Sequence, residues 1–388
     1  MSGHSTRSIM LALSYVILAS LVTTGLIGTS AIARPSKPIV QAPTLQKDVN
    51  ALVTAGAPGA ILLVRNGSHS ASFKAGLDDV TRNRPMRADD HFKIASLTKS
   101  YTATVVLQLV AEGKLQLSDR VERWLPRLLP SGATITIREL LNHTSGIPDF
   151  DTDARYLKPY LSGNLSYYWS PRKLVQIAIS HKPLFPPGMS TKSAYSNTNY
   201  VVLGLIVQAV TGHSMGAELK RRIFQPLHLR HTSYPTKPGL PNPYAHGYLV
   251  LGKPPASDAS ALSPSLSPAS GAIVSTAPDV LNFYRALLSG RLLRPNLLKA
   301  MKTTIPESGK TDIPGQRYGF GLERFPTSCG HAFGHNGLIP GYTTYAFSSG
   351  NGQRQALLMV NEDAGSLPAH VGHLFFKLID TAYCSTPS

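Results

Sequence analysis

The sequence lacks several features on which common protein classes depend. It contains no His-Glu-x-x-His, no Gly-x-Ser-x-Gly and no glycine loop of the type that cradles phosphate, so it does not predict a zinc protease, an α/β-hydrolase or a nucleotide-binding enzyme. Two histidine pairs, His228 with His231 and His370 with His373, have no acidic or cysteine ligand at a suitable spacing. We therefore expect no metal site and no cofactor.

Acidic residues are few. The chain has 21 aspartates and glutamates against 38 lysines and arginines, for a formal net charge of +17. Such a surface favours anionic partners, among them cell-wall polymers and anionic lipid head groups. Because the basic residues are scattered along the chain, we interpret them as a solvated surface and expect no nucleic-acid recognition.

Long apolar runs are confined to the N-terminus. Residues from Ile9 to Ile27 are mostly apolar, Arg7 precedes them, and Ala31-Ile32-Ala33 follows with the small-x-small pattern of a cleavage site. This arrangement predicts a signal peptide over residues 1–33, cleavage near Ala33, and secretion. Because the run is long for a signal peptide, an N-terminal membrane anchor that is not cleaved is the alternative.

Three short motifs stand in a fixed order: Ser96-Leu97-Thr98-Lys99, Tyr195-Ser196-Asn197 and His335-Asn336-Gly337. A serine hydroxyl is a weak nucleophile at neutral pH and needs a neighbour that takes its proton. The apolar spacing after Ser96 predicts a helix over 96–112, and residues three apart on a helix share a face, so the Lys99 amine can reach the hydroxyl. Tyr195 is a second candidate proton carrier, and we expect Lys99 to favour its phenolate form. The set predicts acyl transfer through a serine ester.

Each motif alone has an ordinary structural interpretation. Ser-x-x-Lys also describes a capped helix with a solvated lysine, Tyr-x-Asn a loop, and residues 334–337 a tight turn between strands. Outside the motifs, we expect His143 to be a hydrogen-bonding turn residue and Asp149 and Asp151 to be solvated.

Taken together, the motifs resemble the penicillin-recognising serine hydrolases, which include class C β-lactamases, serine DD-peptidases and β-lactamase-like esterases. The closest resemblance is to the secreted streptomycete-type D-alanyl-D-alanine carboxypeptidase, and it extends from about Val49 to Cys384. It also rests on Leu140-Leu141-Asn142-His143-Thr144-Ser145-Gly146, Tyr195-Ser196-Asn197-Thr198-Asn199-Tyr200, Thr211-Gly212-His213-Ser214, Pro268-Ala269-Ser270-Gly271 and Gly341-Tyr342-Thr343-Thr344-Tyr345-Ala346-Phe347.

The resemblance implies a role for each motif residue. Ser96 would be the acylated nucleophile, Lys99 its partner and Tyr195 the general acid/base. His335 would face the Ser96–Tyr195 pair from a strand. An oxyanion hole would be formed by the backbone N–H groups of Ser96 and Leu338, each such donor being worth about 3 to 4 kcal/mol. Substrate contacts are expected from Asn197, Asn336, Gly337 and Leu338.

The third motif departs from the DD-peptidase pattern. Those enzymes place hydroxyl side chains where this chain has Asn336 and Leu338, and a leucine side chain cannot donate a hydrogen bond to a substrate carboxylate. The arginine expected after residues 318–322 is replaced by Glu323, with Arg324 beside it as a candidate substrate contact. Because Glu323 would repel a carboxylate if it faced the site, esters, amides and amino-acid amides become more plausible substrates.

The hydrophobic patterns predict an αβ arrangement at both ends of the chain with helices between. We expect strands at 60–65 and 70–75, joined by a turn at Asn66-Gly67, and further strands at 318–322, 341–347 and 355–360. Helices are expected at 96–112, 137–142, 171–180, 199–210, 214–224, 278–288 and about 368–382.

The resemblance arranges these elements as an α/β (α+β) fold of the transpeptidase/β-lactamase type, an antiparallel sheet flanked by helices plus a mainly helical domain. The sheet domain would be discontinuous, 34–95 with 265–388, and the helical domain would span 96–264. Its Pro/Gly/Ser-rich segment near 234–270 is expected to form a partly ordered loop at the rim of the site.

Cysteine is nearly absent, since Cys329 and Cys384 are the only two. In an oxidising compartment an isolated pair favours a disulfide over two free thiols, and the resemblance points the same way.

The sequence thus predicts a secreted serine hydrolase that acts through an acyl-enzyme, foremost a D-alanyl-D-alanine carboxypeptidase on peptidoglycan stem peptides. The alternatives are a β-lactamase-like esterase, a D-amino-acid amidase, a β-lactamase, for which β-lactams are substrates rather than inhibitors, and a non-catalytic penicillin- or wall-binding protein.

Overall fold

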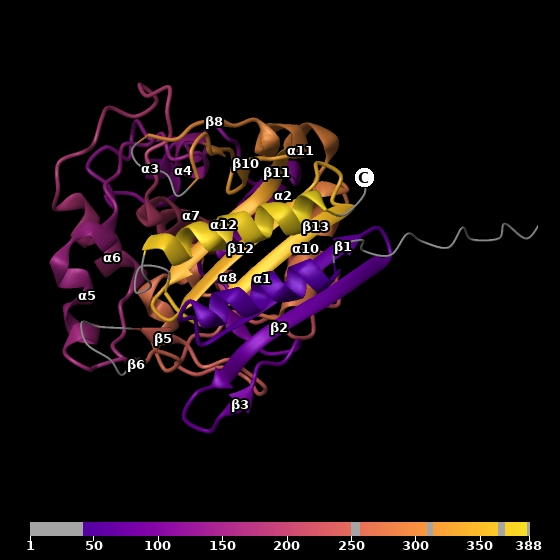
Figure 1. Ribbon diagram of the computed structural model, residues 1–388. Helices are drawn as coiled ribbons and strands as arrows, with labels where there is room; N and C mark the ends of the chain where they lie inside the picture. Colours follow the sequence, from indigo (N-terminus) through magenta and orange to yellow (C-terminus); the bar gives the residue numbers. More distant parts are fainter. Residues whose placement is uncertain (1–41, 250–256, 309–312, 364–368, 386–388) are drawn as a thin grey trace, which may run out of the picture. The chain divides into compact units, whose positions relative to one another are not determined.

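The computed structural model describes residues 42–249, 257–308, 313–363 and 369–385 (Figure 1). The expected signal peptide at 1–33 lies outside these residues and stays a prediction. Among the described residues, no single helix is long and apolar enough to cross a membrane, although residues 197–211 and 215–224, bent by 79° against each other, qualify as a pair by length and composition.

A nine-stranded antiparallel sheet forms the centre of the fold, in the order β3-β2-β1-β13-β12-β11-β10-β9-β8. The hairpin at its start follows from the continuous apolar run at 60–64 and the alternating apolar residues of 69–79. The two strands pair from Gly59 with Gly76 to Asn66 with His69. The connecting turn is Gly67-Ser68, one residue later than expected, because Gly67 supplies the positive φ of 59° that the turn requires. The strands of the sheet are β1 (Gly59–Asn66), β2 (His69–Asp79), β3 (Arg84–Pro85), β8 (Ile305–Pro306), β9 (Arg317–Tyr318), β10 (Glu323–Thr327), β11 (Gly330–Ile339), β12 (Tyr342–Ser348) and β13 (Arg354–Val360).

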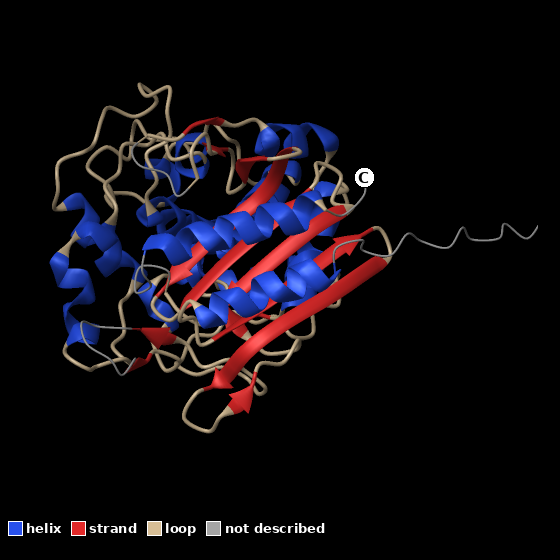
Figure 2. Ribbon diagram, viewed as in Figure 1, coloured by secondary structure: helices blue, strands red, loops and turns tan. Residues whose placement is uncertain are grey.

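Helices α1 (Ala42–Thr54) and α12 (Ala369–Cys384) cover one face of this sheet, where Figures 1 and 2 show them lying over the strands. Their apolar side chains, among them Leu45, Val49 and Phe375, pack on side chains of β1, β12 and β13. The central strands β12 and β13 are therefore buried on both faces. The sequence of β13 is accordingly almost continuously apolar, whereas β12 includes the buried hydroxyl residues Thr343, Thr344 and Ser348. The disulfide between Cys329 and Cys384 joins the end of α12 to the turn between β10 and β11.

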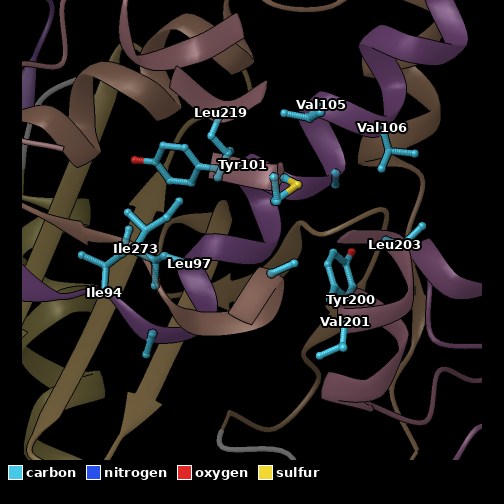
Figure 3. Close-up of a cluster of buried hydrophobic side chains, with 14 of the residues drawn as sticks. Ile94, Leu97, Tyr101, Val105, Val106, Tyr200, Val201, Leu203, Leu219 and Ile273 are labelled. Atoms are coloured by element: carbon cyan, nitrogen blue, oxygen red, sulfur yellow. The ribbon is translucent and has the colours of Figure 1, made fainter. Parts of the chain in front are cut away.

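The other face packs against helices that hold the largest hydrophobic cluster. Helix α2 (Thr98–Ala111) is buried on nearly every side, and Tyr101 stacks on Phe283 of α10 (Ala277–Leu288) with ring centroids 3.5 Å apart. Figure 3 shows Tyr101, Leu97 and Val105 of this region facing Ile94, Ile273 and Leu219. The second half of α2 is mostly apolar, whereas its first turns carry buried polar side chains, among them Lys99 and Ser100.

The remaining elements agree with the expected helical middle of the chain. They are α3 (Val121–Trp124), α4 (Ile137–Leu141), α5 (Ala154–Leu161), α6 (Pro171–Ile179), α7 (Asn197–Thr211), α8 (Met215–Leu219), α9 (Pro268–Gly271) and α11 (Pro295–Lys302), with 3-10 turns η1 (Ala95–Leu97), η2 (Phe150–Thr152) and η4 (Pro264–Leu266), a π-helical turn η3 (Lys220–Phe224), and the strand pairs β4 (Phe92–Lys93) with β7 (Val274–Ser275) and β5 (Tyr248–Leu249) with β6 (Ser257–Asp258). The fold class expected from the sequence is confirmed, whereas the domain boundaries stay a prediction.

The helix expected at 214–224 is present over Met215–Phe224, with its second half, η3, in π-helical form. One local expectation was wrong. The strand expected at 318–322 is confined to Arg317–Tyr318. Gly321 has a φ of 64°, and a Cβ there would lie 2.7 Å from the Lys99 carbonyl oxygen, so a turn packed on α2 replaces the strand.

Candidate active site

Ser96 lies in a strained turn between β4 and α2. Ala95, the residue before it, has a φ of 48°, which is uncommon for a residue with a Cβ. Residues 95–97 form η1, and α2 begins directly afterwards with Thr98, Lys99 and Ser100 all fully buried. The helical spacing brings Nζ of Lys99 to 2.8 Å from Oγ of Ser96, as the sequence predicts.

The Lys99 ammonium has no access to solvent and uses each of its three donor positions. Besides Ser96, it donates to Oδ1 of Asn197 at 2.7 Å and to the carbonyl oxygen of Ser270 at 3.0 Å. Burial lowers its pKa from the ordinary 10.5 to about 7, against the opposing charges of Asp149, Asp151 and Glu323. At neutral pH a substantial fraction of Lys99 is therefore a free amine that can accept the serine proton.

Tyr195 approaches the same serine from the loop before α7. Its hydroxyl donates to Oγ of Ser96 at 2.9 Å, and Nζ of Lys99 lies 4.7 Å from its ring centroid. Burial raises the pKa of Tyr195 well above its ordinary value, and the charge of Glu323 raises it further. The expectation of a phenolate was wrong, because the desolvation of an anion outweighs the attraction of Lys99. Tyr195 is a phenol with a proton to give.

Asn197 is fixed by two aspartates that we expected to be solvated; Asp151 is exposed, whereas Asp149 is partly buried. Asp149 Oδ2 accepts hydrogen bonds from the Asn197 backbone N–H at 2.8 Å and from Nδ2 at 3.0 Å, and Asp151 Oδ2 accepts from the same Nδ2 at 2.9 Å. These bonds orient the amide so that Oδ1 faces Lys99. The only hint in the sequence is that acidic residues, rare in this chain, recur at 149, 151 and 153.

His335 does not contact Ser96 directly; the Tyr195 side chain lies next to both residues. His335 is fully buried in β11; its Nε2 is 3.1 Å from the Tyr318 hydroxyl, and its Nδ1 is within hydrogen-bond distance of the Asn336 carbonyl oxygen. Its ring centroid is 6.3 Å from that of Tyr195, whose hydroxyl is bonded to Ser96 instead. Burial lowers the pKa of His335 to about 3, so the imidazole is neutral. Sequence reasoning missed Tyr318, whose ring packs against both the His335 and the Tyr195 rings, with centroids 5.7 and 5.8 Å away.

The other expected substrate contacts divide into two groups. Leu338 is 40% exposed and lines the cavity at Ser96, whereas Asn336 is buried and donates its backbone N–H to Glu323 at 2.8 Å. Gly337 has a packing function, because a Cβ there would lie 2.6 Å from the Ile94 carbonyl oxygen. Its small size lets β11 run directly beside the nucleophile turn.

Arg324 is placed away from the serine. It pairs with Phe333 across the sheet and does not line the cavity at Ser96. Burial lowers the pKa of His331, and the positive charge of Arg324 lowers it further. The structure therefore does not bring Arg324 to the expected substrate position.

The cavity at Ser96, called the Ser96 cleft below, has a volume of about 250 Å³. It is lined by Ala95, Ser96, Asp151, Tyr156, Leu157, Asn197, Leu266, Ser267, Gly271, Leu338, Ile339, Pro340 and Asp363. The C-terminal part of the Pro/Gly/Ser-rich segment supplies Leu266 and Ser267, so it forms part of the rim; residues 250–256 of that segment lie outside the described chain. Over the described ranges, no three or more His, Cys, Asp or Glu side chains are grouped so that they could hold a metal ion.

Comparison with known proteins agrees with this geometry. The family model for Beta-lactamase matches residues 45–372. A putative penicillin-binding protein, PbpX of Bacillus subtilis (strain 168), is 30% identical over 341 residues, 86% of this chain and 78% of that protein. The chain spans 64% of the length of several other curated relatives.

Two solved structures are similar over nearly their whole length. A D-stereospecific amidohydrolase from a Streptomyces species is 36% identical with a TM-score of 0.79, covering 89% of this chain and 99% of that one. The D-amino acid amidase of Ochrobactrum anthropi SV3, in complex with L-phenylalanine amide, is 29% identical with a TM-score of 0.78, covering 88% and 97%. The family expected from the motifs is confirmed: the chain belongs to the Beta-lactamase family of serine hydrolases, with the fold of that family.

Proposed function

We propose that the protein hydrolyses amides or esters of D-amino acids through an acyl-enzyme on Ser96. The observation that carries this proposal is the position of one serine oxygen between a buried lysine at 2.8 Å and a protonated tyrosine at 2.9 Å, at the wall of an open cleft. In this arrangement the serine is a nucleophile, the lysine can act as its base and the tyrosine can act as a separate acid.

The reaction follows from these contacts. The neutral amine of Lys99 accepts the Ser96 proton as Oγ attacks the substrate carbonyl, and the backbone N–H groups of Ser96 and Leu338 would stabilise the oxyanion. Tyr195 gives its proton to the leaving nitrogen, and the Lys99 ammonium returns a proton to Tyr195. Water then attacks the ester and gives up a proton through the same Tyr195 and Lys99, while Oγ of Ser96 is released with its proton restored.

The lining of the cleft supports a substrate without a carboxylate at the leaving group. Of the described residues that line it, Asp151 and Asp363 are acidic and none is lysine, arginine or histidine. Glu323 stands where the resemblance expects an arginine, and Arg324 lies elsewhere. The two structural neighbours named as a D-stereospecific amidohydrolase and a D-amino acid amidase support the same choice.

A D-alanyl-D-alanine carboxypeptidase, the first choice from the sequence, becomes the second candidate. Its support is the similarity to a putative penicillin-binding protein. Acylation by a β-lactam needs the same three side chains, so penicillin labelling is expected for either candidate. A carboxypeptidase would act on peptidoglycan stem peptides. The basic surface of the protein would bind anionic cell-wall polymers.

A substrate panel tests the proposal. The purified protein and its Ser96→Ala variant would be given D-phenylalanine amide, L-phenylalanine amide, a short-chain nitrophenyl ester, a D-Ala-D-Ala tripeptide and a chromogenic cephalosporin. We expect serine-dependent release of ammonia from the D-amide and little from the L-amide. Release of D-alanine from the peptide without amide turnover would favour the carboxypeptidase, and penicillin labelling without any turnover would favour a binding protein.

Secretion is part of the proposal and has its own test. Expression of the full chain in a bacterium with a secretory pathway, followed by N-terminal sequencing of the product in the medium, should give Arg34 as the first residue. A membrane-bound product that keeps residues 1–33 would favour the anchor instead.

A further inference from the structure

The Ser96 cleft has a charge opposite to that of the molecule as a whole. The chain carries a net charge of +17, yet the described residues that line this cleft include Asp151 and Asp363 and no basic side chain. A cavity lined by one sign of charge attracts ligands of the other sign and disfavours those of its own. The cleft is therefore suited to a cationic ligand.

Asp151 lies in the wall of the cleft, close enough to the catalytic groups to bind a cation beside the reacting carbonyl. The residue is exposed, it lines the cleft, and Asn197 Nδ2 holds its Oδ2 at 2.9 Å. The other end of the same amide accepts from Lys99 at 2.7 Å, and Lys99 lies 2.8 Å from Oγ of Ser96. One asparagine side chain thus separates the carboxylate from the base of the reaction. In an α-amino acid derivative, the nitrogen of the α-ammonium is only two covalent bonds from the carbonyl carbon that Ser96 attacks.

The remaining wall of the cleft is apolar. Leu157, Leu266, Leu338, Ile339 and Pro340 contribute to it, and Leu338 is 40% exposed immediately after the third motif. An apolar patch inside a ligand cavity is a site for an apolar group of the ligand, and the few polar groups fix its orientation.

We propose that Asp151 binds the α-ammonium of the substrate, so that the enzyme selects amides or esters of amino acids with a free amino group and an apolar side chain. This inference rests on the proposed function and narrows its substrate class. It separates such substrates from N-acylated peptides, in which the amino group is blocked and uncharged, and from substrates with a carboxylate near the scissile bond.

The first experiment measures selectivity for the amino group. D-phenylalanine amide and N-acetyl-D-phenylalanine amide are compared as a ratio of kcat/KM values in the wild type, Asp151→Asn, Asp363→Asn and the surface control Asp89→Asn. We expect the wild type to prefer the free amine and Asp151→Asn to lower the ratio about 10-fold or more, the loss of a charge-assisted hydrogen bond. Asp89→Asn should leave the ratio within about twofold, and Asp363→Asn should lower it less than Asp151→Asn does. Equal turnover of the two amides by the wild type, or a loss of selectivity in Asp363→Asn instead, would overturn the assignment.

The second experiment needs no turnover and so separates this inference from the reaction. In the Ser96→Ala background, calorimetry is used to measure binding of the same two amides with and without Asp151→Asn. If Asp151→Asn weakens the binding of D-phenylalanine amide about 10-fold and leaves the binding of the N-acetyl amide unchanged, the ammonium site is supported, even if the wild type hydrolyses a different bond. Unchanged binding of both amides contradicts the site, whatever the substrate panel shows for Ser96.

Discussion

The Glu323 carboxylate oxygen Oε2 lies 3.6 Å from Nδ1 of His335, with both side chains buried behind the nucleophile. The same oxygen accepts the backbone N–H of Asn336 at 2.8 Å, so the third motif is anchored to a buried anion. This anion raises the pKa of Tyr195, second only to burial, and opposes the burial that lowers the pKa of Lys99. Glu323 therefore influences the acid and the base of the reaction without touching either the serine or the cleft.

The pH dependence of the wild type should report Lys99 together with Asp149, because burial raises the pKa of Asp149 to about 7 as well. The pKa of Lys99 is about 7 and the amine is the active form, so kcat/KM for an uncharged nitrophenyl ester should rise with pH and reach half of its limiting value near pH 7. His335, with a pKa of about 3, should add no limb between pH 5 and 8. A limb that disappears in His335→Gln while the plateau persists would show instead that the histidine carries the proton.

Glu323→Gln should move this limb to lower pH. A buried negative charge stabilises the protonated forms of Lys99 and Tyr195, so its removal lowers both pKa values, while the glutamine can still accept the Asn336 N–H. The measurement is the kcat/KM profile of the variant from pH 5 to 9. Asp48→Asn on α1, on the opposite face of the sheet, is the matched control and should leave the midpoint unchanged. An unmoved midpoint in Glu323→Gln would mean that this carboxylate has no electrostatic influence on the site.

What could be predicted from the sequence depends on how local each relationship is. The contact between Ser96 and Lys99 needs only the three-residue spacing of a helix, and the hairpin at 59–79 needs only two apolar segments joined by a glycine turn. The place of Tyr195 came from a resemblance, since no local rule brings residue 195 to residue 96.

The errors arise from burial and packing, which the sequence does not display. The phenol form of Tyr195 and the hydrogen bonds from Asn197 to Asp149 both depend on which neighbours exclude water. The turn that replaces a strand at 318–322 depends on the close approach of Gly321 to α2. Each is a property of contacts between segments far apart in the chain.

Asp149 should be a positioning residue for Asn197. Its removal in Asp149→Ala leaves the amide free to rotate, and we expect kcat to fall about 10-fold to 100-fold, as small misplacements of catalytic groups do. Asp149→Asn keeps an acceptor and should retain more activity. Both changes remove the largest of the carboxylate charges that raise the pKa of Lys99, so both should move the acid limb to lower pH. A role in folding alone would reduce activity without moving that limb.

The disulfide should stabilise the fold without serving the reaction. It spans 55 residues, and in the chain-entropy model the double change Cys329→Ser and Cys384→Ser lowers the free energy of unfolding by about 4 kcal/mol. Because α12 covers the face of the sheet opposite α2, kcat/KM at 25 °C should change by less than about twofold. Urea unfolding of both proteins, with and without a reductant, provides the test. Equal stability of the wild type and the variant in the absence of reductant would contradict this expectation.

Tyr195→Phe should affect substrates according to their leaving group. The change removes only the hydroxyl that donates to Ser96, so the fold should be retained. An amide needs a proton on its leaving nitrogen, and the loss of a positioned acid costs about 10²-fold to 10⁴-fold in rate. Nitrophenolate leaves as an anion at neutral pH and needs no such proton, so acylation by the nitrophenyl ester should fall much less. Single-turnover rates of acylation by the two substrates compare these losses directly. If both fell by the same factor, Tyr195 would be orienting or activating Ser96 rather than protonating the leaving group, and the division of labour between Lys99 as base and Tyr195 as acid would have to be reversed.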